Sequence, residues 1–216
     1  MHTLKVGDIA ITWFGHASFL IEGDEIIYVD PFVLPNSPKK ADTVLVTHDH
    51  FDHCDPEKIK KLNGEVFGPA GVAKKTGCTL VGTGKNFSAG QSKIHVVEAY
   101  NTNKFRAPGQ LFHPKGLGVG YVIEMNGKRI YHSGDTDNIP EMASLGRIDA
   151  ALLPIGGTYT MTLREAAEAA KIIKPIHLIP MHYNSDKYGI TGLNTDTREL
   201  EMLLRKGVVS VLEPSA

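Results

Sequence analysis

Short apolar runs separated by turn residues dominate the first part of the chain, a pattern that predicts β-strands rather than helices. The runs Ile9–Phe14, Ser18–Glu22 and Ile26–Val29 are rich in β-branched and aromatic residues, and Gly23 with Asp24 separates the last two as in a hairpin. Asp42–Thr47 holds the apolar run Val44-Leu45-Val46 between two β-branched threonines, which is typical of a buried strand. We therefore expect a sheet whose buried strand ends where a polar, histidine-rich segment begins.

The remainder of the chain alternates between helix and strand signals. Helices are expected from the N-cap Asp55 to Gly64, over Ala70–Lys75, from the Thr162–Glu165 capping box to Pro175, and from Asn194 or Asp196 to Gly207. Strands are expected at Lys93–Tyr100, Val119–Met125, Lys128–Tyr131, Ala150–Pro154, Ile176–Pro180 and Val208–Leu212, with Asn126-Gly127 as a hairpin turn. Strand-rich segments followed by helices, twice over, favour two packed sheets with helices outside.

Composition adds few constraints on function. The chain has 216 residues, 23 basic and 24 acidic, with a formal net charge of −1. This length suits one domain, 1–216, without a disulfide framework, and the near-neutral charge argues against a nucleic-acid surface. The N-terminus lacks the pattern of a signal peptide, and no apolar run approaches the ~20 residues that cross a bilayer. A cytoplasmic protein without a membrane segment is expected.

The most informative feature is a segment that follows the predicted buried strand. Its sequence is His48-Asp49-His50-Phe51-Asp52-His53, and the whole chain has 10 histidines. Imidazoles and carboxylates packed this densely after a strand suit a transition-metal site better than they suit packing. The sequence therefore predicts that this segment nucleates a metal centre.

The same segment resembles the His-x-His-x-Asp-His signature of the metallo-β-lactamase superfamily. Three further motifs of that family occur in order: Tyr28-Val29-Asp30-Pro31, Tyr131-His132-Ser133-Gly134-Asp135-Thr136 and Pro180-Met181-His182-Tyr183. The resemblance implies a four-layer αβ/βα sandwich and a hydrolase with a binuclear metal site.

Carried over by motif, the resemblance implies a set of metal ligands. His48 and His50 would bind the first metal, Asp52, His53 and His182 the second, and Asp135 would bridge the two. Asp30 would orient a ligand without binding metal. The family's usual third ligand of the first metal is missing from its expected motif. His113 is the main candidate for that position, and Asn101 and His95 are the alternatives.

Finer features resemble one branch of the family, the small hydrolases similar to ascorbate-phosphate lactonase. They are Trp13-Phe14-Gly15-His16-Ala17-Ser18, His113-Pro114-Lys115-Gly116 and Pro154-Ile155-Gly156-Gly157-Thr158-Tyr159. The resemblance implies a homo-oligomer and places His16 at the pocket rim, near the substrate or a metal ligand; a buried structural role is the alternative. His16, Lys115 or Tyr159 would then contact a negative group of the substrate.

Together these features predict a hydrolase with two divalent transition-metal ions, zinc or manganese, with iron or nickel as alternatives. Such a pair lowers the pKa of water toward ~7, and Asp52 can orient the nucleophile or accept its proton. The expected substrate is a small molecule that contains an ester, lactone or phosphoester, and both anionic and neutral substrates are open. The alternatives are a phosphodiesterase or nuclease acting on nucleotides or RNA, a redox diiron protein and a non-catalytic metal-binding oligomer.

Overall fold

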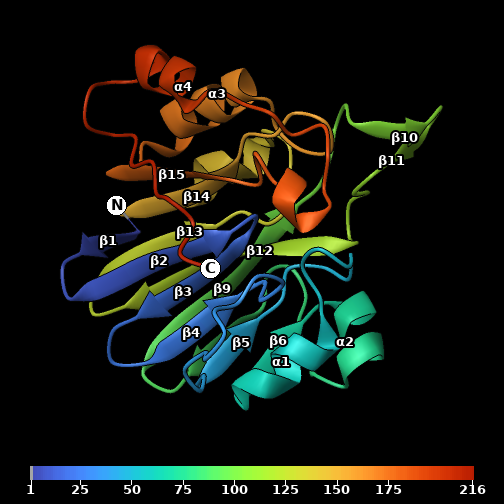
Figure 1. Ribbon diagram of the computed structural model, residues 1–216, viewed down its shortest axis with the longest axis vertical. Helices are drawn as coiled ribbons and strands as arrows, with labels where there is room; N and C mark the ends of the chain where they lie inside the picture. The colour runs from blue at the N-terminus through green and yellow to red at the C-terminus, as the bar shows by residue number, and fades with distance from the viewer. Residues whose placement is uncertain (1) are drawn as a thin grey trace.

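A computed structural model describes residues 2–216 and contains two large mixed sheets (Figure 1). In spatial order the first sheet holds β1 (Thr3–Val6), β2 (Ile9–Gly15), β3 (Ser18–Glu22), β4 (Ile26–Val29), β5 (Thr43–Leu45), β6 (Glu65–Gly68) and β7 (Thr79–Leu80). The second sheet holds β15 (His177–Met181), β14 (Ala150–Pro154), β13 (Lys128–His132), β12 (Gly118–Met125), β9 (Ser92–Ala99) and β8 (Asn86–Ala89). A small ribbon of β10 (Phe105–Ala107) and β11 (Gln110–Leu111) extends away from both sheets.

In the described part of the chain, residues 2–216, four α-helices and two 3₁₀ helices accompany the sheets. They are α1 (Pro56–Leu62), α2 (Ala70–Thr76), η1 (Pro140–Ser144), α3 (Leu163–Ile173), η2 (Asp186–Tyr188) and α4 (Thr197–Leu203). α1 and α2 lie on the side of the first sheet, and α3 and α4 lie on the side of the second (Figure 1). The expected caps are present: Asp55 accepts hydrogen bonds from the backbone of α1, and Thr162 and Glu165 form a capping box on α3.

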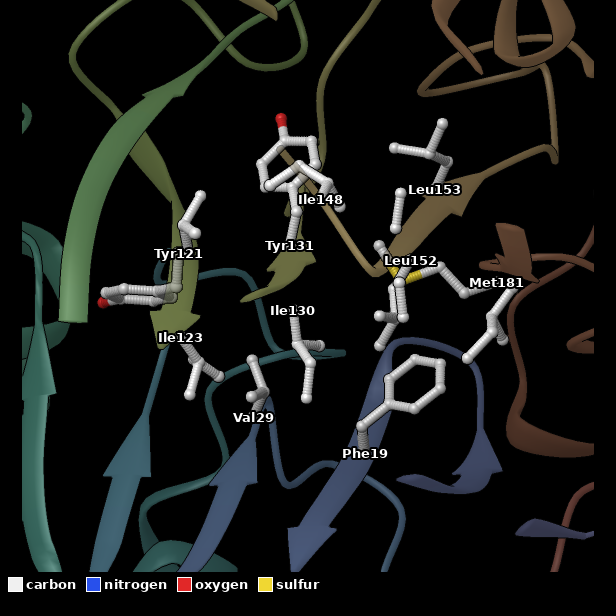
Figure 2. Close-up of a cluster of buried hydrophobic side chains, with 14 of the residues drawn as sticks. Phe19, Val29, Tyr121, Ile123, Ile130, Tyr131, Ile148, Leu152, Leu153 and Met181 are labelled. Carbon is white, nitrogen blue, oxygen red and sulfur yellow. The ribbon is translucent and has the colours of Figure 1, made fainter. Parts of the chain in front are cut away.

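The hydrophobic core lies between the two sheets and continues beneath the helices. Along β3, Phe19 and Ile21 belong to the core between the sheets, whereas Leu20 belongs to the cluster under α1 and α2. This alternation with period two is what a strand with two buried faces requires. Figure 2 shows Phe19 and Val29 of the first sheet directed toward the side chains of the second, among them Ile130. The expected α/β sandwich is therefore confirmed.

The C-terminal segment departs from the prediction. α4 begins after the N-cap Asp196 and ends at Leu203, not at Gly207. Val208–Leu212 forms no strand and makes only an isolated bridge between Leu178 and Val209. The reason is that the chain crosses to the other sheet, where the backbone nitrogen of Ser215 donates to the carbonyl of Trp13 at 3.0 Å. A segment that leaves the sheet edge after one bridge cannot continue the pairing.

One edge of the sandwich collects the ends of strands from both sheets. β4 and β5 are parallel in the first sheet, as are β13, β14 and β15 in the second. Parallel neighbours bring their carboxyl ends to the same edge, which is where open α/β sheets place their sites. Asp30 follows β4, the segment from His48 to His53 follows β5, Asp135 follows β13 and His182 follows β15. Four of the sequence motifs therefore meet at one edge.

Candidate metal centre

The segment after β5 is held between the two sheets. The backbone nitrogen of Val119 donates to the carbonyl of Thr47 at 2.9 Å, and the buried Tyr121 hydroxyl donates to the carbonyl of Val46 at 2.8 Å. β5 therefore ends against β12 of the other sheet, and the chain turns there into the histidine-rich segment. Within that segment Asp49 turns outward, since its carboxylate lies 3.6 Å from the Lys75 ammonium.

One group of candidate ligands consists of His48, His50 and His113, which we name the three-histidine cluster. One ring nitrogen from each lies within 4.8 Å of the others. Nδ1 of His50 is 3.1 Å from Nε2 of His48 and 3.1 Å from Nε2 of His113. His113 comes from the segment before β12, 63 residues away from His50. The structure thus brings His113 to the place that the sequence left open.

A second group consists of His16, Asp52, His53 and His182, which we name the mixed cluster. One ligand atom from each lies within 4.8 Å of the others. Oδ2 of Asp52 is 3.1 Å from Nε2 of His16 and 3.9 Å from Nε2 of both His53 and His182. The backbone nitrogen of His182 donates to the carbonyl of His16 at 2.9 Å, so the turn after β2 and the loop after β15 support each other.

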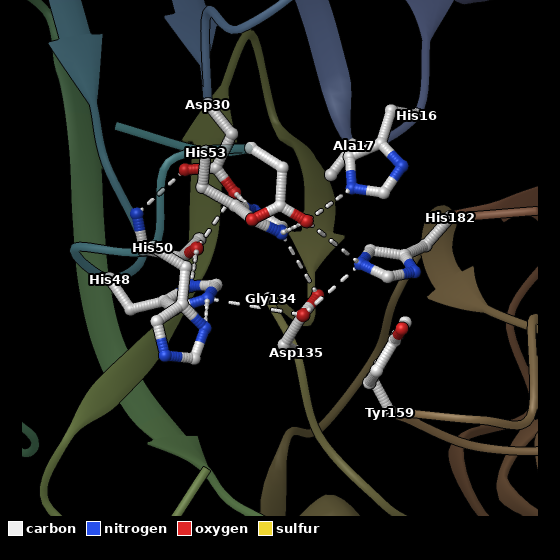
Figure 3. A network of polar contacts seen from close by, with 12 residues as sticks. His16, Ala17, Asp30, His48, His50, His53, Gly134, Asp135, Tyr159 and His182 are labelled. Atoms are coloured by element: carbon white, nitrogen blue, oxygen red, sulfur yellow. Dashed lines mark hydrogen bonds and ion pairs between the residues drawn. The ribbon is translucent and has the colours of Figure 1, made fainter. Parts of the chain in front are cut away.

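Asp135 lies between the two clusters (Figure 3). Its Oδ2 is 3.2 Å from Nε2 of His113 and 3.1 Å from Nε2 of His182, and its Oδ1 is 3.3 Å from Nε2 of His53. The preceding Gly134 has φ 61°, and a Cβ there would lie 2.8 Å from the carbonyl of Val119. Glycine therefore permits the tight turn that presents Asp135 to both clusters.

Asp30 and Thr47 set the orientation of two imidazoles. Oδ2 of Asp30 accepts hydrogen bonds from the Thr47 hydroxyl and from Nδ1 of His53, both at 2.7 Å. Because the Thr47 hydroxyl donates its hydrogen to Asp30, its oxygen accepts from Nδ1 of His48 at 3.0 Å. In their neutral forms both imidazoles carry the proton on Nδ1 and direct the lone pair of Nε2 into the site. The expected supporting contact of Asp30 is present.

Asn101 does the same for His113. Its Oδ1 accepts hydrogen bonds from the backbone nitrogen of His113 at 2.8 Å and from Nδ1 of His113 at 3.0 Å. The amide nitrogen of Asn101 donates to Asp137 at 3.2 Å and to the carbonyl of Tyr159 at 3.0 Å, which decides which end of the amide faces His113. Asn101 thus supports His113 rather than replacing it. The other alternative, His95, contacts Asn86 and Glu124 outside both clusters.

His16 is placed differently from the expectation. It is fully buried and does not line the cavity at the site, so its position at the pocket rim is wrong, whereas the expected contact with a candidate metal ligand is present, to Asp52 at 3.1 Å. The Trp13 indole donates to the carbonyl of His16 at 3.0 Å. The Ser185 hydroxyl donates to the carbonyl of Tyr183 and therefore accepts from Nδ1 of His16 at 2.9 Å. Nε2 of His16 then faces Asp52, which makes His16 a candidate ligand of the mixed cluster.

Unpaired atoms show that this arrangement suits a cation. Among the described residues, the buried atoms without a hydrogen-bond partner include Nε2 of His53, Oδ1 of Asp135 and both ring nitrogens of His182. Buried polar atoms are rarely left unpaired, and here the lone pairs of imidazoles and carboxylates converge. The residues present therefore fit divalent transition-metal ions, whose preferred donors are imidazole nitrogen and carboxylate oxygen.

The electrostatics of the site also favour a bound cation. Burial, together with neighbouring imidazoles, holds the pKa of His48 well below 6.5 and lowers that of His16 to about 3. Burial would likewise lower the pKa of His53, but the carboxylates around it, first Asp135, hold that pKa well above 6.5. Burial would raise the pKa of Asp135, yet the nearby histidines keep it well below 3.8. The carboxylates thus favour a positive charge at the point where a metal ion would lie.

Backbone conformation offers a further mark of the site. His16, Asp30 and His182 have φ angles of 52°, 46° and 57°. Non-glycine residues in this left-handed region are uncommon, and they persist where the surrounding contacts impose them, often at functional sites. All three belong to the metal centre or support it directly.

A cavity of about 330 Å³ opens beside the clusters. Its lining includes five of the candidate ligands, His50, Asp52, His113, Asp135 and His182, together with Phe51, Phe112, Tyr159, Gly189, Ile190 and Thr191. Tyr159 is thus placed where it was expected. Lys115 is not, because its exposed ammonium pairs with Glu141 at 2.8 Å instead of lining the cavity.

The fold and the site define a class, the metal-dependent hydrolases of the metallo-β-lactamase fold. The family model described as beta-lactamase superfamily domain matches residues 10–182. The chain therefore belongs to that family, and it is a metal-dependent hydrolase.

Relatives cover almost the whole chain. A UPF0173 metal-dependent hydrolase of Pyrococcus furiosus is 34% identical over 95% of this chain and 97% of its own, and one of Thermococcus kodakarensis is 36% identical with the same coverage. A solved structure, a proposed metal-dependent hydrolase of Parabacteroides distasonis, has 33% identity and a TM-score of 0.85, covering 98% of both chains. The finer resemblance to ascorbate-phosphate lactonases stays a prediction. Within residues 2–216, no helix is long and apolar enough to span a membrane.

Proposed function

We propose that the chain hydrolyses a small ester or lactone at a centre of two divalent transition-metal ions, zinc or manganese. The three-histidine cluster would hold one ion and the mixed cluster the other, with Asp135 in contact with both. The main support is the geometry around Asp135, whose two oxygens lie 3.1 to 3.3 Å from the inward-facing Nε2 atoms of His113, His182 and His53. Iron and nickel are alternatives with the same donor preference.

Divalent ions at such a centre lower the pKa of water and polarise the carbonyl oxygen under attack. Asp52 lines the cavity and its side chain is 13% exposed, so it can accept a hydrogen bond from an incoming water molecule. Burial would raise the pKa of Asp52, but the neighbouring His53 holds it below 3.8. Asp52 therefore stays ionised at neutral pH and can orient the nucleophile. The Tyr159 side chain lies at the same cavity, where it can contact the substrate.

The open cavity also separates this proposal from a structural metal site. Structural zinc sites are closed by four protein ligands, whereas catalytic sites keep a position open to water or substrate. Here five candidate ligands line a cavity that a small molecule can enter. This supports catalysis over a non-catalytic metal-binding oligomer. That the chain forms a homo-oligomer stays a prediction, which light scattering after size-exclusion chromatography tests.

Metal analysis combined with activity measurements tests the proposed function. Protein reconstituted with zinc or manganese should hold close to two ions per chain and should hydrolyse aryl esters or lactones above the rate of the metal-free protein. Less than half an equivalent of metal after reconstitution contradicts the binuclear centre. Two bound ions without hydrolysis of esters, lactones or phosphodiesters contradict the catalytic role.

A further inference from the structure

The cavity beside the metal centre has an apolar part that no candidate ligand occupies. Phe112 packs against Tyr159 with ring centroids 4.9 Å apart and planes at 86°. Ile190 and Phe51 also line this space. The cavity therefore joins a polar, ligand-bearing side to an aromatic and aliphatic one, which is the usual composition of a small-molecule site.

Phe51 is the most unusual of these residues. It follows the candidate ligand His50, and 67% of its surface is exposed although it is a large apolar side chain. Its ring contacts Phe32 edge to face, with centroids 6.0 Å apart. Covering this exposed apolar surface with an apolar group of a ligand would be favourable. Removal of apolar surface from water contributes about 25 cal/mol of favourable free energy per Å². The position of Phe51 thus favours a ligand with an apolar substituent.

Positive charge is missing from the cavity lining. Across residues 2–216, no lysine or arginine is among the residues that line it. Lys115 pairs with Glu141 at 2.8 Å and Glu98 at 3.6 Å, and Lys104 pairs with Glu165 at 2.9 Å and Asp137 at 3.6 Å. These lysines already have carboxylate partners outside the cavity.

An anionic substituent would therefore have no counter-charge away from the metal centre. Transfer of an unpaired carboxylate or phosphate from water to an apolar surface is costly. The positive charge of a metal centre acts at the reacting carbonyl, and it cannot neutralise an anion at the far end of the substrate. Specificity here would arise as much from rejection of anions as from contact with apolar groups.

We infer that the substrate is an uncharged ester or lactone with a flat apolar or aromatic substituent that packs against Phe51, Phe112 and Ile190. This inference rests on the proposed function, and it replaces the expectation of an anionic substrate contacted by Lys115. In the reaction, water adds its oxygen to the carbonyl carbon and the ester C–O bond breaks. A proton of the water passes to the leaving oxygen, so an ester gives a carboxylic acid and an alcohol, and a lactone gives a single hydroxy acid. No oxidant or reductant is needed. The acid ionises at neutral pH, so the same lining that rejects anions favours its release.

Two aryl acetates of nearly equal shape test this inference. In 4-acetoxybenzamide the ring carries a neutral amide, and in 4-acetoxybenzoate it carries a carboxylate of similar size. With the protein loaded with metal, and with rates corrected for spontaneous hydrolysis, we expect kcat/KM to be at least about tenfold higher for the amide. Bis(4-nitrophenyl) phosphate, an anionic phosphodiester, should be cleaved more slowly than the amide-bearing ester.

Thr191→Lys supplies the charge that the cavity lacks. Thr191 lines the cavity and is exposed, so lysine can be accommodated without disturbing the core. We expect this variant to raise kcat/KM for the carboxylate ester relative to the amide by about tenfold. Thr83→Lys is the matched control, because Thr83 is an equally exposed threonine outside this cavity. It should leave the ratio unchanged.

The outcomes separate the inference from the proposed function. Equal or faster cleavage of the carboxylate ester or the phosphodiester by the unmodified protein overturns the inference and leaves hydrolysis by the metal centre intact. The inference is also overturned if Thr191→Lys and Thr83→Lys change the ratio of kcat/KM for the two aryl acetates equally. If a protein holding two metal ions cleaves none of the three compounds and no neutral aromatic lactone, the proposed function fails, and the inference fails with it.

Discussion

The two ligand clusters that meet at Asp135 differ in charge, although each lines the cavity with two of its residues. The three-histidine cluster offers only imidazoles, and its His50 and His113 line the cavity. The mixed cluster adds the carboxylate of Asp52, and its His16, His53 and His182 are fully buried. A divalent ion would therefore meet one more negative charge in the mixed cluster than in the three-histidine cluster. We expect the mixed cluster to bind its ion more tightly and the other to exchange more readily.

The two clusters also differ in how many distant segments of the chain contribute their ligands. His48 and His50 come from one short segment and need one distant partner, His113. The mixed cluster joins the turn after β2, the histidine-rich segment and the loop after β15, and the contact between His16 and Ser185 spans 169 residues. The mixed cluster thus depends more on the assembled sandwich. We therefore expect the mixed cluster to contribute to the stability of the fold, and the three-histidine cluster to hold the metal ion that exchanges more readily.

The largest effect is expected from Asp135→Ala, because Asp135 is the carboxylate in contact with both clusters. The variant should lose both metal ions and lower kcat/KM at least about a thousandfold, equivalent to about 4 kcal/mol. Elemental analysis and steady-state kinetics measure the two losses, with circular dichroism to check folding. Asp49→Ala is the control, since Asp49 pairs with Lys75 outside the site. Two retained ions with more than a tenth of the activity would show that Asp135 is not shared.

Variants that alter one cluster at a time should show how much each cluster contributes to activity and to metal binding. Asp52→Ala and His53→Ala should each lower turnover at least about a hundredfold while the fold is retained, because they remove groups that face the buried ion. Steady-state kinetics measure this loss.

His113→Ala should release one ion selectively and leave the mixed cluster filled. Metal content after dialysis against a weak chelator measures this. Release of both ions from His113→Ala in one step would contradict the independence of the clusters.

Asn101→Ala tests the support of the three-histidine cluster. Loss of a side chain that orients a metal-binding histidine typically lowers metal affinity by about 10–100-fold. We expect that decrease for one of the two ions, with the His113 ring still present but free to rotate. Competition with a chromogenic chelator gives both affinities. The prediction is wrong if both ions are weakened equally or if neither changes.

The smallest effect is expected for the pH dependence of the free energy of unfolding of the metal-free protein. Burial lowers the pKa of His16 to about 3 in the folded chain, against 6.5 for an exposed histidine. Between these values the unfolded chain binds the proton and the folded chain does not, so His16 makes stability fall as pH falls below 6.5, by about 1.4 kcal/mol per pH unit at most. His16→Asn, a residue that tolerates the left-handed backbone, should lose less stability between pH 6.5 and 5. Urea unfolding with a chelator present measures the slope, and identical slopes in both proteins refute the assignment.

Much of the fold could be predicted from local patterns. The Asp55 cap of α1, the capping box of α3, the Asn126-Gly127 turn and most strands were expected where they occur, because each depends on neighbouring residues. The short strands β1, β6, β7, β8, β10 and β11 were not expected, since they contain few residues and pair mainly through the backbone. The predicted strand Val208–Leu212 failed for the opposite reason. Its residues favour a strand, but the chain crosses to the other sheet before it can pair.

For the candidate metal centre, the sequence by itself predicted the types of side chain and most of the residues that the structure gathers in the two clusters. Densely spaced histidines and aspartates after a buried strand predict a metal site because chemistry, rather than packing, explains such a run. Only the tertiary structure decided between His113 and Asn101, made His16 a buried candidate ligand and moved Lys115 away from the cavity. These choices depend on distances between atoms far apart in the chain. Local residue patterns do not determine such distances, because the packing of the two sheets against each other sets them.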